Sequence, residues 1–354
     1  MKIIRHGLSR GLAALLAVCL AAGLAVNASG AGAEGAAGEN GIFASDAFLV
    51  MEGIPTFYSG DFEYTVTNGN ATIVKYSGSA GILAVPDQLD GHGVEKIGDE
   101  AFSGCRNLTG VTLPDGLTSI GDGAFARCGS LTGVTLPDGL ISIGDGAFSH
   151  CGSLTSVTIP ESVAVMGHSP FAACTALTRI DVAAPNPVYA SIDGVLFEER
   201  HNMLVTYPAG RIDNAYAIPQ GILYIGVEAF SGCRNLTGVT LPDGLISIGN
   251  YAFSTCQNLT GMTLPDSLTS IGDGVFFTCW NMTSITLPDG LTSIGNAAFY
   301  KCKGLTSVTL PDSLTSIGVD VFAECPNLTL TVAEGSRAAE YAGENGIPYT
   351  FGHD

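Results

Sequence analysis

The sequence predicts a repeat solenoid, mainly β with turns, in which each coil of about 23 residues holds one short strand and both ends of the stack are capped. Two observations support this prediction. A phenylalanine stands three residues before each of nine cysteines, and glycine supplies 47 of the 354 residues, which favours frequent turns. The cysteines recur with one fixed period within two runs: Cys105, Cys128, Cys151 and Cys174, then Cys233, Cys256, Cys279, Cys302 and Cys325.

The apolar positions of the repeat are the same in both runs. Leucine, or once Met282, stands three residues after each cysteine, and another apolar residue usually follows three positions later. Since no coil can bury such a face alone, we expect stability to come from the stacking of neighbouring coils. The phenylalanines that begin the pattern are Phe102, Phe125, Phe148, Phe171, Phe230, Phe253, Phe276, Phe299 and Phe322.

Within one coil, Val111–Leu113 alternates apolar and polar residues as a short strand does. Pro114–Gly116 ends the strand, because proline cannot donate to a continuing ladder and glycine accepts turn dihedrals. Leu117 and Ile120 then point back into the core, and Gly121–Gly123 turns the chain again. Each coil is therefore expected to contain one strand and two turns.

The repeat is interrupted between the two runs of cysteines. The step from Cys174 to Cys233 is more than twice the period that separates the other neighbouring cysteines. The extra residues predict an irregular insertion over about 183–222, with two short strands in 186–197 and 203–208 around a polar turn. We expect an irregular pair of coils within one continuous solenoid.

Both ends of the solenoid, predicted over 60–354, depart from the repeat as caps do. Phe62–Val66 and Ala71–Tyr76 predict a starting hairpin, followed by a degenerate first coil. The C-terminal cap is expected over about 328–354, with a short helix through Arg337–Ala342 and a closing segment at Ile347–Phe351.

The N-terminal residues have the layout of a targeting segment. Lys2, Arg5 and Arg10 precede an apolar run and then small residues, which predicts a signal peptide over 1–28. The apolar run, about 15 residues, is short for a membrane anchor, which needs about 20; a lipoprotein cysteine at Cys19 is a further alternative. An Ala/Gly-rich tether is expected over 29–59. The expected location is secreted or extracellular, at or away from the cell surface, with no membrane span after signal removal.

The repeated cysteines do not have the pattern of disulfides or of a zinc site. Nine is an odd number, and stacked parallel side chains lack the crossed geometry that a disulfide prefers. Zinc motifs need pairs of cysteines within a few residues of each other. We therefore predict buried thiols that serve as small apolar residues, and we expect no metal and no cofactor.

The unit Ile-Gly-Asp-x-Ala-Phe-x-x-Cys-x-x-Leu-Thr-x-Val-Thr-Leu-Pro resembles the repeat of the BspA-like leucine-rich repeat proteins of bacteria. The block from Asn186 to Pro208 and the ending from Gly335 to Gly346 resemble recurring features of the same family. The resemblance implies a curved, strand-lined solenoid at or outside the cell surface, in a family implicated in adhesion to host proteins, matrix or other cells. It implies no catalytic residues. The expected lack of a wall-anchoring module places permanent surface attachment in doubt.

The charge and motif content argue against nucleic-acid binding and catalysis. A net charge of −19 is opposite to what phosphates attract. The histidines after the predicted signal peptide stand at unrelated repeat positions, and no known hydrolase or phosphate-binding motif is present. Repetition favours a broad binding surface over a site where unlike groups converge, so we predict that the protein is not an enzyme.

Two polar rows are candidates for such a surface. The first holds outward strand threonines, interrupted by Asp181; the bland alternative is that threonine simply suits an exposed strand. The second is acidic, running from Asp115 to Asp312 with a companion row at Asp99, Asp122, Asp145 and Asp273, and is interpreted as turn residues splayed into solvent or held by divalent cations. The candidate ligand-binding threonines are Thr112, Thr135, Thr158, Thr240, Thr263, Thr286 and Thr309.

Three aromatic residues break the repeat at positions that are small or polar in most coils. Phe277, Trp280 and Tyr300 are expected to form an outward cluster that contacts a ligand, with Lys301 and Lys303 beside it. The alternative is a local packing cluster that covers a gap at a neighbouring core position.

The leading functional hypothesis is an exported, non-enzymatic leucine-rich repeat protein that acts like an adhesin. Its expected partner is a protein or glycan at a cell surface or in a matrix. The alternative is a structural or cation-binding envelope spacer without a specific ligand. The sequence leaves the ligand, the attachment mode and the oligomeric state open.

Overall fold

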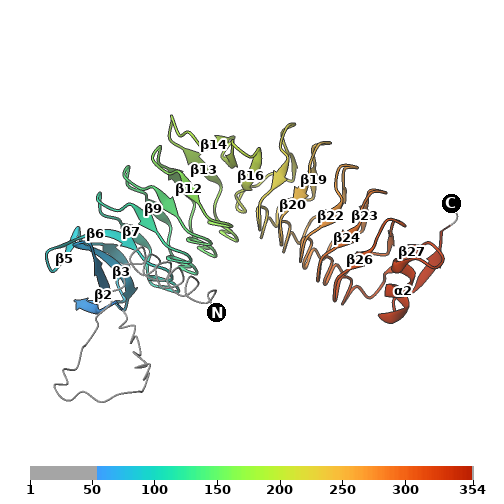
Figure 1. Ribbon diagram of the computed structural model, residues 1–354, viewed down its shortest axis with the longest axis horizontal. Coiled ribbons are helices and arrows are strands. Elements are labelled where there is room, and N and C mark those ends of the chain that lie inside the picture. Colours follow the sequence, from blue (N-terminus) through green and yellow to red (C-terminus); the bar gives the residue numbers. More distant parts are fainter. Residues whose placement is uncertain (1–53, 353–354) are drawn as a thin grey trace, which may run out of the picture.

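A computed structural model describes residues 54–352, which form a stack of coils along a curved axis (Figure 1). Equivalent strands of neighbouring coils pair in parallel and lie one period apart in the sequence, as Gly110 and Gly133 do. The predicted mainly β solenoid with a 23-residue period is confirmed.

The predicted strand of each coil forms the first strand row. It begins at the N-terminal end with β4 (Ile82–Ala84) and ends at the C-terminal end with β27 (Thr329–Val332). Between them lie β7 (Gly110–Thr112), β9 (Gly133–Thr135), β11 (Ser156–Ile159), β13 (Arg179–Val182), β17 (Ala215–Ala217), β19 (Gly238–Thr240), β21 (Gly261–Thr263), β23 (Ser284–Thr286) and β25 (Ser307–Thr309).

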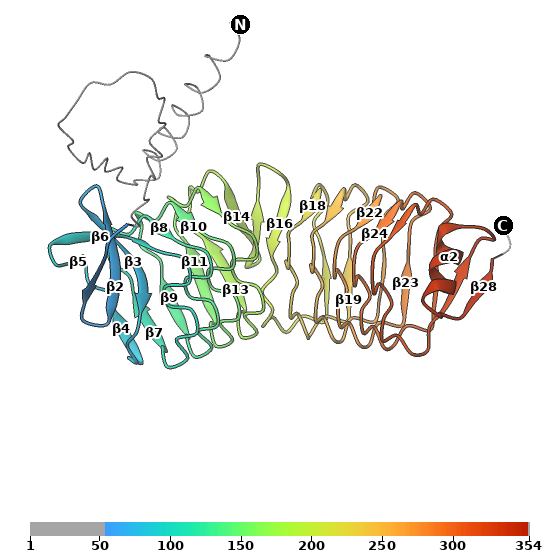
Figure 2. The ribbon, with the colours of Figure 1, turned by 60° about the horizontal axis from the view of Figure 1, so that its bottom comes forward.

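Each coil also holds a second strand, which the prediction of one strand per coil missed. Except for the longer first member, β6, it is two residues long, usually Ser-Ile, because a glycine turn follows at once, and it still pairs in parallel with its neighbours. Figure 2 labels members of both rows. The second row comprises β6 (His92–Ile97), β8 (Ser119–Ile120), β10 (Ser142–Ile143), β12 (Val165–Met166), β18 (Tyr224–Ile225), β20 (Ser247–Ile248), β22 (Ser270–Ile271), β24 (Ser293–Ile294) and β26 (Ser316–Ile317).

The N-terminal cap is a small antiparallel sheet. The predicted hairpin is present as β2 (Phe62–Thr67) and β3 (Asn70–Tyr76), and β5 (Gln88–Leu89) pairs with β6. A further strand, β1 (Thr56–Ser59), pairs with β2. The folded part therefore begins before residue 60. The predicted end of the tether, at residue 59 of the range 29–59, lies too far along the chain, because β1 already occupies Thr56–Ser59. The predicted signal peptide and the rest of the tether lie outside the described residues.

The C-terminal cap matches its prediction. Helix α2 (Arg337–Glu344) begins where the Ser336 side chain accepts a hydrogen bond from the Ala339 amide, and it buries Tyr341 against the last coil. β28 (Tyr349–Phe351) then pairs in parallel with β27.

The insertion contains three strands where two were predicted. β14 (Tyr189–Ile192), β15 (Val195–Glu198) and β16 (Met203–Thr206) pair antiparallel in this order. The prediction was wrong for 186–197, because Asp193 and Gly194 both adopt positive φ and fold this segment into a hairpin.

The insertion sheet separates two hydrophobic cores. Leu196 and Val205 belong to the core of the N-terminal coils, whereas Val195, Phe197 and Leu204 belong to the core of the C-terminal coils. Alternate side chains of β15 and β16 therefore serve different cores.

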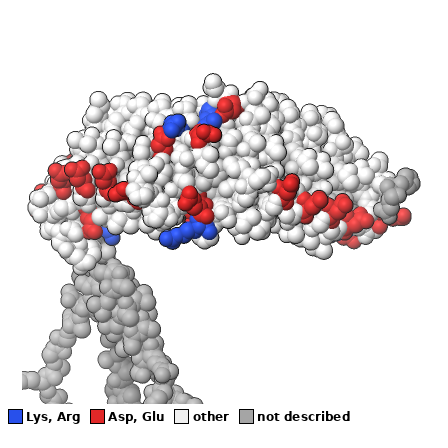
Figure 3. All heavy atoms as spheres, turned by 90° about the horizontal axis from the view of Figure 1, so that it is seen from above, with Lys and Arg blue, Asp and Glu red and all other residues white. Residues whose placement is uncertain are grey.

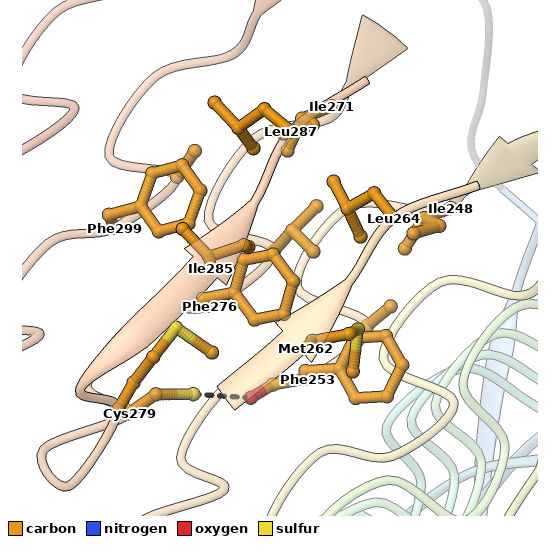
Figure 4. Close-up of a cluster of buried hydrophobic side chains, with 14 of the residues drawn as sticks. Ile248, Phe253, Met262, Leu264, Ile271, Phe276, Cys279, Ile285, Leu287 and Phe299 are labelled. Atoms are coloured by element: carbon orange, nitrogen blue, oxygen red, sulfur yellow. Dashed lines mark hydrogen bonds between the residues drawn. The ribbon is translucent and has the colours of Figure 1, made fainter. Parts of the chain in front are cut away.

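Each core contains a ladder of stacked phenylalanine rings. Neighbouring rings lie 4.8–5.6 Å apart from Phe102 to Phe171 and again from Phe230 to Phe322. Tyr76 and Tyr207 stack on the first ring of each run. Figure 4 shows part of the second ladder with the aliphatic side chains beside it.

The cysteines lie beside this ladder and make a contact that the sequence analysis missed. The Cys279 thiol donates to the backbone carbonyl of Phe253 in the preceding coil, with Sγ and O 3.1 Å apart (Figure 4). Seven of the nine thiols are buried, as predicted, while Cys105 and Cys325 near the ends are half-buried. Burial raises the pKa of Cys128 to about 12 and that of Cys325 to about 11.

The companion acidic row forms a second ladder between coils. Asp99 Oδ1 accepts the backbone amide of Asp122, 2.9 Å away, and Asp122 accepts that of Asp145 in the same way. Asn250, Asp273 and Asn296 repeat the contact in the C-terminal coils. The aspartates Asp99, Asp122 and Asp145 are exposed, as interpreted, but the interpretation missed that one oxygen of each accepts a backbone amide of the next coil. The row from Asp115 to Asp312 is exposed, as expected.

We predict that Cys128→Ala destabilises the protein by about 1 to 2 kcal/mol, since it removes a buried hydrogen bond and leaves a small cavity. Urea unfolding measures this loss. In a Cys19→Ser background, a thiol reagent should modify Cys105 and Cys325 well before the buried seven. Rapid native-state labelling of those seven would contradict the assignment.

We predict that Asp122→Ala lowers the free energy of unfolding by about 1 kcal/mol, because the Asp145 amide loses its acceptor. Asp122→Asn should retain most of the stability, since asparagine already fills this position at Asn250 and Asn296. Asp115→Ala, in the exposed row, is the matched control. Equal losses for Asp122→Ala and Asp115→Ala in urea titrations would show that the ladder contributes nothing.

Candidate binding surface

The predicted threonine row forms an exposed face on the first strand row, interrupted at Asp181 and at the insertion. In each of these strands the apolar residue before the threonine faces inward, so the threonine faces solvent. Thr112 pairs in register with Thr135, and Thr263 with Thr286. All seven candidate threonines are exposed: Thr112, Thr135, Thr158, Thr240, Thr263, Thr286 and Thr309.

A neighbouring threonine row, three residues earlier in each coil, has a different role. The Thr260 hydroxyl donates to the Thr237 carbonyl one coil before, and Thr283 donates to Thr260, each over 3.0 Å. In contrast, no side-chain hydrogen bond within residues 54–352 involves the hydroxyls of the exposed face, such as Thr263 and Thr286. The earlier row links the coils, whereas the exposed row keeps its donors and acceptors available.

A shallow groove of about 900 Å³ runs over β17, β19, β21 and β23. Thr240, Thr263 and Thr286 line it, together with Tyr216 and Asp243. Three of the seven candidate threonines therefore share one concave surface across neighbouring coils.

The predicted aromatic cluster divides into two pairs. Phe277 and Tyr300 stack with ring centroids 5.0 Å apart, and Lys301 lies over the Tyr300 ring. Trp280, 44% exposed, has Lys303 Nζ 5.9 Å from its ring centroid and pairs with no aromatic ring in the described part of the chain. The structure thus places the three residues near two lysines without joining all three rings.

The sequence analysis missed two partners of this aromatic group. Tyr251 meets the edge of Phe277 at 6.2 Å; its signal was an aromatic residue at a repeat position that is otherwise small or charged. The Tyr300 hydroxyl donates to Glu324, 2.8 Å away, and Lys301 lies 3.5 Å from the same carboxylate. The hydrogen bond from Tyr300, aided by the lysine charge, lowers the pKa of Glu324.

The surface carries its charge in separate groups. Figure 3 shows acidic residues in two runs, one toward each end of the stack, with lysine and arginine gathered near the middle and much of the visible face uncharged. The exposed row from Asp115 to Asp312 carries no lysine or arginine. An uncharged threonine face beside acidic turns suits a ligand recognised by hydrogen bonds and shape.

No helix within residues 54–352 has the length and apolar character needed to cross a bilayer. No three His, Cys, Asp or Glu side chains of that range come together as a metal site requires.

The stacked parallel strands, the phenylalanine ladder and the exposed strand face define a leucine-rich repeat solenoid. A family model described as the BspA type leucine rich repeat region matches residues 92–204 and 214–331, in six copies. Since these residues make up more than half of the chain, it belongs to the BspA-type leucine-rich repeat family.

Three solved structures of similar proteins come from bacteria. A leucine-rich cell surface protein of Faecalibacterium prausnitzii is 28% identical, with a TM-score of 0.54, over 85% of this chain and 100% of that chain. The pneumococcal vaccine antigen PcpA is 20% identical, with a TM-score of 0.62, over 85% and 99%. A leucine-rich repeat protein of Eubacterium ventriosum is 23% identical, with a TM-score of 0.50, over 75% and 93%. The last two likenesses show the fold alone. No curated protein matches this chain.

We predict that truncation of two adjacent phenylalanines destabilises the protein to very different extents. Phe276→Ala, in the core ladder, should cost about 3 to 5 kcal/mol. Phe277→Ala, in the half-buried outer pair, should cost about 1 kcal/mol or less. Thermal unfolding followed by circular dichroism distinguishes the two. A loss for Phe277→Ala as large as that for Phe276→Ala would make the outer aromatic group a packing element of the core.

Proposed function

We propose that this chain is an exported, non-enzymatic binding protein of the adhesin type, whose threonine face holds a protein or glycan at a cell surface or in a matrix. The observation that supports this most strongly is the contrast between the two threonine rows. One row uses its hydroxyls to join coils, and the other leaves an equally regular set exposed and without side-chain hydrogen bonds in the described residues. The hydrogen bonds of the first row stabilise the stack of coils. The exposed threonines form no such bonds within residues 54–352, so the stability of the stack does not explain why threonine recurs there.

The aromatic group gives a second contact region for the same ligand. Trp280, Phe277 and Tyr300 offer contact area at low entropic cost, and the two lysines add donors in a chain that has few. Membership in the BspA-type family and likeness to a cell surface protein support an extracellular location.

The residue chemistry argues against an enzyme. His168 and Ser169 are adjacent, but the Ser169 hydroxyl donates to the Val227 carbonyl at 2.9 Å, and His168 lies beside Asp145. A nucleophilic serine would instead donate to a general base.

The alternative of a cation-loaded spacer draws support from the acidic rows. Each ladder aspartate uses one oxygen for a backbone amide and keeps another toward solvent, where calcium would relieve repulsion. Melting with and without calcium tests this alternative directly.

We predict saturable binding of the full chain to at least one member of a panel of immobilised matrix proteins and a glycan array. The triple variant Thr240→Glu, Thr263→Glu and Thr286→Glu should weaken that binding at least about tenfold, because the charges block the groove. Trp280→Ala with Tyr300→Ala should also weaken it. In the unmodified chain, the emission of Trp280, the single indole of the sequence, should change on binding.

The matched control is Ile246→Glu, an exposed residue beside the second strand row, which should bind normally. Binding that survives the threonine variant would remove this face from the function. No saturable binding, together with a higher melting temperature in calcium, would favour the spacer.

A further inference from the structure

A pocket of about 470 Å³ lies where the insertion meets the last N-terminal coil. Met166–Ser169, at the end of β12, forms one wall. The insertion sheet and the strands that follow it form the other wall. We call it the junction pocket.

The strand register lines up its second wall. Glu198 of β15 pairs with Met203 of β16, Met203 pairs with Tyr224 of β18, and Tyr224 pairs with Ser247 of β20. All four residues line the pocket. The pleat therefore presents a carboxylate, a thioether, a phenol and a hydroxyl along one line across four strands.

The floor of the junction pocket is apolar. Met166 and Met203 pack against the N-terminal core, and Val205 and Ile225 are almost fully buried beneath the opening. The regular row of second strands stops at β12, and the antiparallel insertion follows, so this core is not closed here by another coil. A concave apolar floor with a few polar groups is the usual form of a small-molecule site.

The junction pocket has a carboxylate in its lining but, among the described residues, no lysine or arginine. That carboxylate, the only one among the described lining residues, belongs to Glu198. The Glu198 side chain is 13% exposed, and Oε1 lies 2.7 Å from His201 Nδ1. Its Oε2 has no hydrogen-bond partner within residues 54–352. A largely buried carboxylate with a free oxygen favours a cationic or donor group beside it.

We propose that the junction pocket binds a small organic amine with an apolar or aromatic body. The body rests on Met166, Met203, Val205 and Ile225, and the ammonium group donates to the free oxygen of Glu198. This site is separate from the threonine face and does not depend on the function proposed for that face.

Isothermal titration of the full chain with three matched probes tests the proposal. Phenethylamine should bind, phenethyl alcohol should bind at least about tenfold more weakly, and the anion hydrocinnamate should not bind. Glu198→Gln should abolish the preference for the amine over the alcohol. Glu199→Gln, on the exposed turn next to it, should leave that preference unchanged.

Ser247→Phe locates the site, because a ring at this position fills the pocket and should abolish binding of every probe while the circular dichroism spectrum stays native. The threonine triple variant should bind phenethylamine like the unmodified chain. The proposal is overturned by the absence of saturable phenethylamine binding, by equal affinities for all three probes, or by an amine preference that survives Glu198→Gln.

Discussion

The stacking of each phenylalanine on its equivalent one coil later is the contact on which the other features depend. Ring centroids 4.8–5.6 Å apart match the spacing of paired strands, so one period brings both rings and strands into register. Once that register is set, each repeated polar side chain meets the same group of the neighbouring coil at every step. Three sets of hydrogen bonds between coils follow from the same 23-residue step. They are the thiol bonds to phenylalanine carbonyls, the amide bonds to aspartate and asparagine, and the bonds of the threonine row that contains Thr260.

The insertion shows what happens when this register is broken. The phenylalanine ladder stops at Phe171 and restarts on Tyr207, whose hydroxyl donates to Asp213, itself 2.6 Å from Arg211. Between them lies the insertion sheet, which packs one apolar face against the N-terminal core and the other against the C-terminal core. The junction pocket is the place where this closure is incomplete, so the break in the repeat also breaks the uniformity of the surface.

The period allowed much of the fold to be predicted. Cysteine and phenylalanine spacing was enough for the solenoid and its stacked core, because these depend on which residues are apolar. Both caps were predicted from where the sequence departs from the repeat, through the strand pattern before the first coil and the helix signals after Gly335. The second strand was missed because two-residue pairing leaves little pattern. The β14–β15 hairpin did have a signal, the Asp193-Gly194 turn between two apolar runs, but the segment was interpreted as one strand. The two threonine rows look alike in sequence. They differ in hydrogen bonding, because the Thr260 hydroxyl reaches a carbonyl of the preceding coil and the Thr263 hydroxyl does not. The junction pocket could not be predicted, because β12, β15, β16, β18 and β20 build it together.

The central claim is that the exposed threonine row is the binding face and that the ladders beneath it only hold it in register. Photo-crosslinking from single positions tests this most directly, with the benzophenone amino acid placed at Thr263 or at Ile246 and the panel member that binds as target. The account predicts a crosslink from Thr263 that excess unlabelled protein competes away, and none from Ile246. A crosslink from Ile246 in place of Thr263 would contradict it.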